Sequence, residues 1–115
     1  MSLFSFSGTP PTDLGVTNGR LKSCPDTPNC VCSQASESDK EHVIAAFSYT
    51  GSASDAIARL KQIIEAMERS TINTVSDDYL YVEFSSKLMG FVDDVEFYAV
   101  PGKSVIETRS AARLG

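Results

Sequence analysis

The sequence has no tryptophan, a single histidine, only three cysteines and few basic residues. Lys and Arg total 10 against 15 Asp and Glu, which gives a formal net charge of −5 over 115 residues. A protein that binds nucleic acid by neutralising phosphates needs the opposite balance, so no nucleic-acid partner is expected. No apolar run approaches the roughly 20 residues that a membrane-spanning helix needs, so no transmembrane segment is expected.

Recognisable catalytic and cofactor motifs are also missing. The chain contains no G-x-S-x-G nucleophile turn, no G-x-G-x-x-G loop and no phosphate loop. Its 42% hydrophobic and 22% charged residues are enough for one folded domain. We therefore expect no cofactor and favour a non-enzymatic binding or assembly module. Its partner, a protein or a small molecule, is not indicated, and a homo-oligomer is an open alternative.

Two parts of the chain differ in composition. Residues 1–40 hold four of the five prolines and all three cysteines. Because proline lacks an amide donor and glycine tolerates unusual backbone angles, this part favours irregular structure. We expect residues 1–10 to be disordered and residues 13–34 to be pinned to the rest through the cysteines. Residues 41–115 show clear periodicity and form the expected domain.

One helix is predicted over residues 53–69. Ser52 can cap its first turn, and Asp55 places a carboxylate at its positive end. Apolar residues then recur at spacings of three and four, which is typical of an amphipathic helix with one face to bury. These residues are Ala56, Ile57, Leu60, Ile63, Ile64 and Met67.

Other segments have the composition of strands. The run 43–49 suits a buried strand, and four more segments follow the helix: 71–76, 79–86, 91–100 and 104–111. In the second of these, three apolar residues alternate with Tyr79, Tyr81 and Glu83, which indicates a half-buried strand. The pattern predicts an α+β fold in which one long amphipathic helix packs on one face of an antiparallel sheet of four to five strands, after an irregular Pro/Cys-rich N-terminal wrap.

The length of the last hairpin loop, even or odd, decides which residues of its two strands share a face. A two-residue loop at Pro101-Gly102 places Phe97 opposite Ile106, Asp94 opposite Arg109, and Glu96 opposite Glu107. A four-residue loop keeps the same faces, whereas a three-residue loop would put Ile106 on the acidic side, so an even loop is preferred.

Two groups of motifs resemble a known family. The first runs over residues 15–34 and contains Cys24-Pro25-Asp26-Thr27-Pro28-Asn29-Cys30. The second comprises residues 91–97 together with Arg109-Ser110-Ala111, Arg113 and Gly115. Both are similar to motifs of the domain of unknown function family numbered 1499, over about residues 14–115. The resemblance supplies no activity, because none is established for the family. Cys32 occupies a position where the family more often has serine.

The resemblance also bears on location and extent. The family occurs in bacteria, including cyanobacteria, and in plastid-bearing plants. The chain as given lacks the basic start and apolar stretch of a signal peptide, which favours the cytoplasm. A disulfide would instead require an oxidising compartment, the periplasm or the thylakoid lumen. Members typically continue past the position of Gly115 into a basic segment that looks helical, so we expect this domain to lack a C-terminal extension.

The cysteines allow three interpretations. A Cys24–Cys30 disulfide would staple the irregular segment and contribute about 2.4 kcal/mol in the chain-entropy model. Cys24, Cys30, Cys32 and His42 could instead form a tetrahedral zinc site, although the C-x5-C-x-C spacing is not a usual one. Free thiols are the third alternative. We favour the disulfide and no metal.

An acidic residue on an apolar face is the main candidate for a ligand site. Asp93 alternates with Val95 and Phe97, so its carboxylate lies at the margin of the predicted core and needs a cation or several donors. Ser110 is its cross-strand neighbour in the two-residue register, and Arg109 and Arg113 are near. These four residues could line a small-ligand or hydrolytic site. The simpler alternative is a structural ion pair.

A second candidate surface is apolar. Leu88, Met89 and Phe91 surround a predicted strand connection, where large exposed apolar groups would indicate a partner contact. Tyr79 and Tyr81 lie on the polar side of their strand and could extend that contact. The alternative is a bulged strand tucked under the helix.

Overall fold

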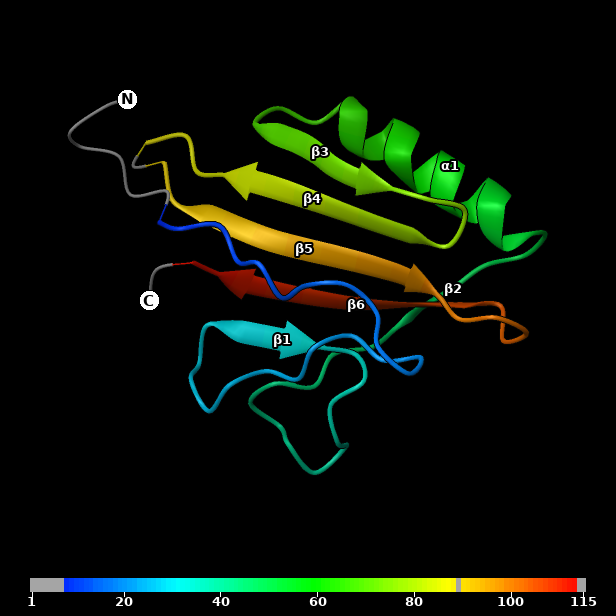
Figure 1. The fold of residues 1–115 in the computed structure, drawn as a ribbon, viewed down its shortest axis with the longest axis horizontal. Helices are drawn as coiled ribbons and strands as arrows, with labels where there is room; N and C mark the ends of the chain where they lie inside the picture. The colour runs from blue at the N-terminus through cyan, green and yellow to red at the C-terminus, as the bar shows by residue number, and fades with distance from the viewer. Residues whose placement is uncertain (1–7, 89, 114–115) are drawn as a thin grey trace.

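The computed structural model describes residues 8–88 and 90–113, which form one antiparallel sheet and one helix (Figure 1). The described elements are β1 (Cys30–Cys32), β2 (Phe47–Ser48), α1 (Ala53–Glu65), β3 (Ser70–Val75), β4 (Tyr79–Ser85), β5 (Val92–Ala99) and β6 (Val105–Ala112). The strand order is β1-β6-β5-β4-β3, and β2 also pairs with β6. The α+β class is therefore confirmed, with six strands in place of the four to five expected.

The helix begins as predicted but is shorter. The Ser52 hydroxyl accepts a hydrogen bond from the Asp55 amide at 3.1 Å, as the capping pattern predicted. The helix has 13 residues and ends at Glu65, so the prediction of a long helix to residue 69 is wrong. The cause is the turn into β3: Arg69 adopts a φ of 59°, and the Ser70 hydroxyl donates 2.8 Å to the Ile64 carbonyl. Within the described residues, no helix has the length and apolar character that a membrane crossing requires.

The hydrophobic core lies between α1 and one face of the sheet. Its buried members are Ala56, Ile57, Ile64, Leu80, Val82, Phe97, Ala99 and Ile106. Two residues assigned to the buried helix face are largely exposed, Ile63 at 63% and Met67 at 49%. Ile63 lies about 120° around the helix from Ile57, beyond the contact with the sheet. Met67 follows the end of the helix.

The strand expected over residues 43–49 is almost absent. Only Phe47 and Ser48 pair with β6, opposite Ile106 and Val105, and Phe47 is 53% exposed. The remaining edge of β6 is taken by β1, which pairs Cys30–Cys32 with Ala111–Arg109. Both short strands therefore share one edge of the sheet. The prediction of a buried strand over residues 43–49 is wrong.

The β5–β6 hairpin has the longer of the two even loops. The Val100 amide donates 3.0 Å to the Val105 carbonyl, which leaves a four-residue loop at 101–104. This register places Glu96 opposite Arg109, Tyr98 opposite Glu107, and Asp94 opposite Ala111. The faces predicted by parity are kept. The pairs drawn for a two-residue loop, Asp94 with Arg109 and Glu96 with Glu107, are wrong.

The N-terminal segment contacts the sheet face opposite to the helix. Figure 1 shows the chain after residue 8 crossing in front of β5 and β6. The Gly15 amide donates 2.8 Å to a carboxylate oxygen of Glu96, and Leu21 is buried in one cluster with Cys32 and Tyr98. Of the segment 1–10 that we expected to be disordered, residues 1–7 lie outside the described residues. The sheet is thus covered on both faces over part of its area.

Candidate functional site

The sheet face beneath the N-terminal segment is polar, although it is buried. Alternation along β5 and β6 places three buried charged residues on this face: Asp94 is 3% exposed, Glu96 0% and Arg109 4%. Transferring charged groups out of water is expensive unless each one finds partners. The hydrogen bonds of these three side chains therefore decide what this face can do.

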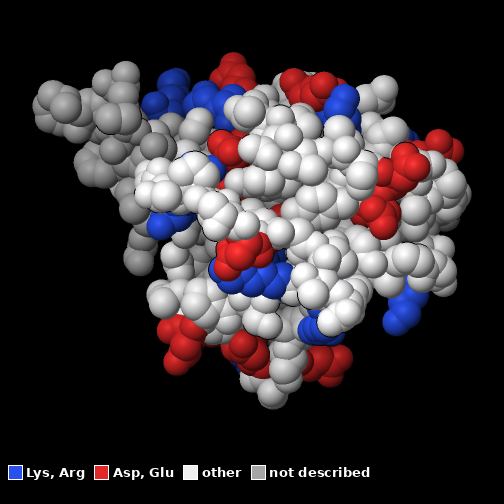
Figure 2. Space-filling model, viewed as in Figure 1, with Lys and Arg blue, Asp and Glu red and all other residues white. Residues whose placement is uncertain are grey.

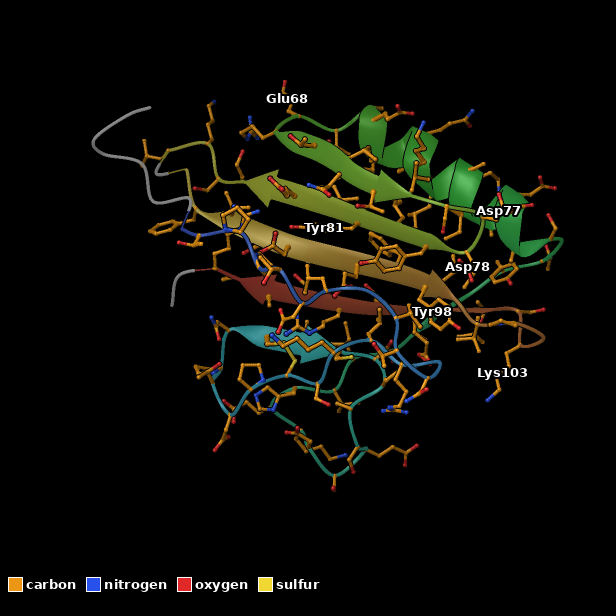
Figure 3. All side chains as sticks on the ribbon, in the orientation of Figure 1. Glu68, Asp77, Asp78, Tyr81, Tyr98 and Lys103 are labelled. Carbon is orange, nitrogen blue, oxygen red and sulfur yellow. A yellow bond between two sulfur atoms is a disulfide. The ribbon has the colours of Figure 1, made fainter. Side chains whose placement is uncertain are left out.

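Asp94 is fully engaged. Arg113 donates from Nε and Nη2 to the two Asp94 oxygens, both at 2.9 Å, in a bidentate pair. The Tyr81 hydroxyl donates a hydrogen bond to Asp94 Oδ1 at 2.5 Å. Arg113 Nη2 also lies 3.2 Å from Glu83 Oε1. The hydrogen bond to Asp94 raises the pKa of Arg113, while burial and the same carboxylate raise the pKa of Tyr81 to about 12. Figure 3 shows Tyr81 over the middle of the sheet.

Glu96 is only half engaged. Its Oε2 accepts from the Gly15 amide at 2.8 Å and from the Tyr79 hydroxyl at 2.5 Å. Burial and, after it, the hydrogen bond to Glu96 raise the pKa of Tyr79. The other oxygen, Oε1, is buried and has no hydrogen-bond partner among the described residues.

Arg109 is the cation opposite Glu96 in the register. Its Nε is buried and has no hydrogen-bond partner, and no described residue forms a hydrogen bond or ion pair with its guanidinium. Its charge is still felt nearby: the pKa of Asp13 is lowered, chiefly by a hydrogen bond from Lys22 and to a lesser extent by Arg109. A buried guanidinium with unused donors is rare in folded proteins, because it forgoes the bonds that offset desolvation.

A pocket of about 400 Å³ opens beside these side chains. Small-molecule pockets span roughly 300–1,000 Å³, so this one is large enough for a ligand. Its charged lining consists of Lys22, Asp94, Arg109 and Arg113. The other lining residues are Thr9, Pro11, Leu14, Ser23, Cys24, Pro25, Thr27, Asn29, Cys30, Ala111 and Ala112. We call this cavity the Arg109 pocket.

The cysteine loop forms one wall of the Arg109 pocket. Cys24 and Cys30 form the expected disulfide, with Cα atoms 5.6 Å apart. Asn29 then ties the loop to β6, because its amide side chain donates 3.0 Å to the Ala112 carbonyl. The disulfide and this contact hold the wall against the strand that carries Arg109.

The zinc interpretation finds no support in this arrangement. The disulfide uses two of its four proposed ligands, and Cys32 is buried as a free thiol. His42 is 5% exposed, with Nδ1 2.8 Å from Asp39 and Nε2 2.7 Å from the Thr27 carbonyl. These contacts raise the pKa of His42, the Thr27 carbonyl most. In the described part of the chain, no three His, Cys, Asp or Glu side chains are grouped to hold a metal.

The expected ligand residues are only partly brought together. Arg109 and Arg113 line the pocket, but Ser110 is not among its lining residues. The expected burial of Asp93 is wrong: it is exposed, because the helix face is open to solvent at that end of β5. The buried acid–arginine pair is formed by the next residue, Asp94.

The expected apolar contact surface is divided. Leu88 is 89% exposed and Phe91 42%, whereas Met89 lies outside the described residues. Tyr79 and Tyr81 do not extend this surface, because their hydroxyls bind Glu96 and Asp94 beneath the N-terminal segment. Tyr81 is buried and Tyr79 is half-buried, so neither offers the open surface that an extended contact would need.

Surface charges are mixed around the site. Figure 2 shows acidic and basic side chains interspersed on the face that carries the N-terminal segment. In one such pair, Lys22, which lines the Arg109 pocket, lies 2.6 Å from Asp13. Any recognition of charge at this site therefore depends on local groups more than on an extended field.

Comparisons with known proteins place the chain in a family. A family model described as "Protein of unknown function (DUF1499)" matches residues 20–115. The chain belongs to this family, as the cysteine and arginine motifs indicated. Neither a search of curated proteins nor a search of solved structures found a match. Family membership carries no activity, so a function has to be argued from the geometry of the site.

Proposed function

We propose that this DUF1499 protein is a non-enzymatic binding module that holds a small anionic molecule in the Arg109 pocket. The observation that carries the proposal is Arg109, a residue that is 4% exposed and whose buried Nε has no hydrogen-bond partner among the described residues. A ligand carboxylate or phosphate would supply the missing acceptors through charge-assisted bonds, which are the strongest type available to arginine.

The surroundings favour binding over catalysis. Hydrolysis would need a nucleophile beside a base. Both nitrogens of His42 are engaged, by Asp39 and Thr27, and Cys24 and Cys30 are bonded to each other. Asp94 already accepts from Arg113 and Tyr81, which leaves it poorly placed to act as a general base. The lining therefore suits recognition of a ligand.

The proposal is tested by titrating ¹⁵N-labelled protein with acetate, benzoate, octanoate and inorganic phosphate. We expect saturable shifts of the Ala111, Ala112 and Thr27 amides with at least one of these anions. Arg109→Met should weaken that binding at least tenfold, since it removes the one cation in the described pocket lining that has no acidic partner. Arg109→Lys keeps the charge but loses the forked donor, and it serves as the second variant if Arg109→Met does not fold.

Lys103 offers a matched control. It is an exposed cation in the β5–β6 loop, far from the pocket lining (Figure 3), so Lys103→Met should leave the affinity unchanged. Absence of saturable shifts with all four anions would overturn the proposal. Equal affinity of a folded Arg109→Met protein would overturn it as well.

A further inference from the structure

We infer that the ligand of the Arg109 pocket is a monocarboxylate with an apolar body. The inference rests on the proposed anion site and narrows its ligand class. It excludes inorganic phosphate, dicarboxylates and tricarboxylates as preferred ligands. Three properties of the pocket lead to it: the number of uncommitted charges, the shape of the free donor and the chemistry of the walls.

Only one of the three cations in the lining is uncommitted. Lys22 Nζ donates 2.6 Å to Asp13, and Arg113 holds Asp94 through two bonds of 2.9 Å. Arg109 alone has no acceptor among the described residues. A ligand with a second negative charge would have to break one of the existing pairs or leave that charge without a partner, and either outcome costs affinity.

The charge behind Arg109 sets the same limit. Glu96 lies opposite Arg109 on β5, is fully buried, and has one oxygen without a partner. Asp13 adds a second carboxylate as the partner of the lining residue Lys22, and its pKa is lowered mainly by Lys22 and to a small extent by Arg109. Asp13, Asp94 and Glu96 together match the formal charges of Lys22, Arg109 and Arg113, so the site has no surplus positive charge to balance a second or third negative charge on a ligand.

The free donor has the shape that a carboxylate needs. A guanidinium is a planar fork whose paired N–H groups match two carboxylate oxygens in a bidentate arrangement. The chain already builds one such pair, because Arg113 grips Asp94 from Nε and Nη2. Arg109 carries the same donor set with its Nε unused. A ligand carboxylate would complete a second pair of this kind.

The remaining walls are mostly apolar. Leu14 and Pro11 come from the N-terminal segment, Ala111 and Ala112 from the end of β6, and Pro25 from the cysteine loop, next to the disulfide. These five side chains offer no donors to the hydroxyl groups of sugars or to further carboxylates. Of the neutral polar residues in the lining, Thr27 donates its hydroxyl to Asn29, and Asn29 donates its amide to the Ala112 carbonyl, so neither is fully available to a ligand. They favour a hydrocarbon body, with a gain of about fourfold in affinity for each methylene buried.

The experiment is a calorimetric and NMR titration with acetate, butanoate, hexanoate and octanoate, beside adipate, hexan-1-ol and inorganic phosphate. Affinity should rise by about fourfold per methylene until the pocket of about 400 Å³ is filled. Hexanoate should bind at least tenfold more tightly than adipate, which has the same chain length and a second charge. Hexanoate should also bind more tightly than hexan-1-ol, by a similar factor.

Two variants separate the head group from the body. Arg109→Met should remove the preference for hexanoate over hexan-1-ol. Leu14→Ser, at a half-buried position of the pocket wall, should flatten the chain-length series by lowering the affinity for octanoate more than the affinity for acetate. If adipate or phosphate equals hexanoate, the monocarboxylate inference fails while the anion site stands. If no anion binds saturably, both fail.

Discussion

Glu96 and Arg109 face each other on β5 and β6, almost completely buried, yet neither Glu96 Oε1 nor Arg109 Nε has a hydrogen-bond partner in the part of the chain that the structure describes. Two opposite charges so placed would ordinarily form an ion pair. Instead Glu96 directs its other oxygen to Gly15 and Tyr79, and the Arg109 side chain lines the pocket. The arrangement leaves the cation available to a ligand, and the proposed function depends on it.

The Asp94 network should be the most sensitive part of the polar face. Arg113→Met would leave the Asp94 carboxylate buried without its cation, a change that typically costs about 3–5 kcal/mol. Tyr81→Phe removes one hydrogen bond to a charged acceptor and should cost about 1.5–3 kcal/mol. Urea unfolding measures both. A cost for Arg113→Met no larger than that for Tyr81→Phe would contradict the bidentate pairing described above.

The disulfide should stabilise both the fold and the pocket wall. Closing the short loop between Cys24 and Cys30 contributes about 2.4 kcal/mol to the free energy of unfolding in the chain-entropy model. The double variant Cys24→Ser/Cys30→Ser should lose about that amount and bind hexanoate more weakly, since the loop also supplies Pro25, Thr27 and Asn29 to the lining. Addition of dithiothreitol to the wild-type protein should reproduce both effects. Unchanged affinity after complete reduction would show that the wall does not need the disulfide.

His42 should make the stability depend on pH. Its contacts with the Thr27 carbonyl and Asp39 raise its folded-state pKa above 6.5. Both neighbours are acceptors, so the protonated ring is the form that the fold favours. Its contribution is complete below the unfolded-state pKa and is lost as the pH rises through the folded-state value.

The corresponding measurement is the free energy of unfolding from pH 5.5 to pH 8.5. We expect a decline toward high pH in the wild-type protein and a flatter profile in His42→Gln. Because His42 is the only histidine, no other imidazole competes for this effect. A parallel decline in both proteins would assign it to another group.

Short-range signals were enough to predict the helix start and the central strands. Ser52 and Asp55 lie three residues apart, and the alternation in β4 separates a face that packs against α1 from a polar face. The far end of the helix was harder to predict, because the apolar spacing continues to Met67 whereas the turn at Arg69 and Ser70 ends the helix earlier.

The candidate site depends on contacts between residues far apart in the sequence. Parity assigned Asp94 to the polar side of β5, which is correct. What the pattern could not indicate is that this side is buried, since its cover includes Gly15, 81 positions before Glu96. The prediction of a buried Asp93 fails for the opposite reason. Its side chain lies on the apolar face of β5, but that face is open to solvent at residue 93. A buried polar face could have been suspected only from the regular placing of Tyr79, Tyr81, Asp94 and Glu96 on one side.

The most direct test of the account follows the Nε–H resonance of Arg109 during a titration with hexanoate. An acceptor delivered to this buried, unpaired donor should shift the signal strongly and slow its exchange with water, in step with saturation of the Ala111 and Ala112 amides. The account predicts that response in the wild-type protein, with no comparable change at Arg113, which already holds Asp94. A hexanoate titration that saturates elsewhere while the Arg109 signal stays unchanged would contradict the claim that this guanidinium is the anchor.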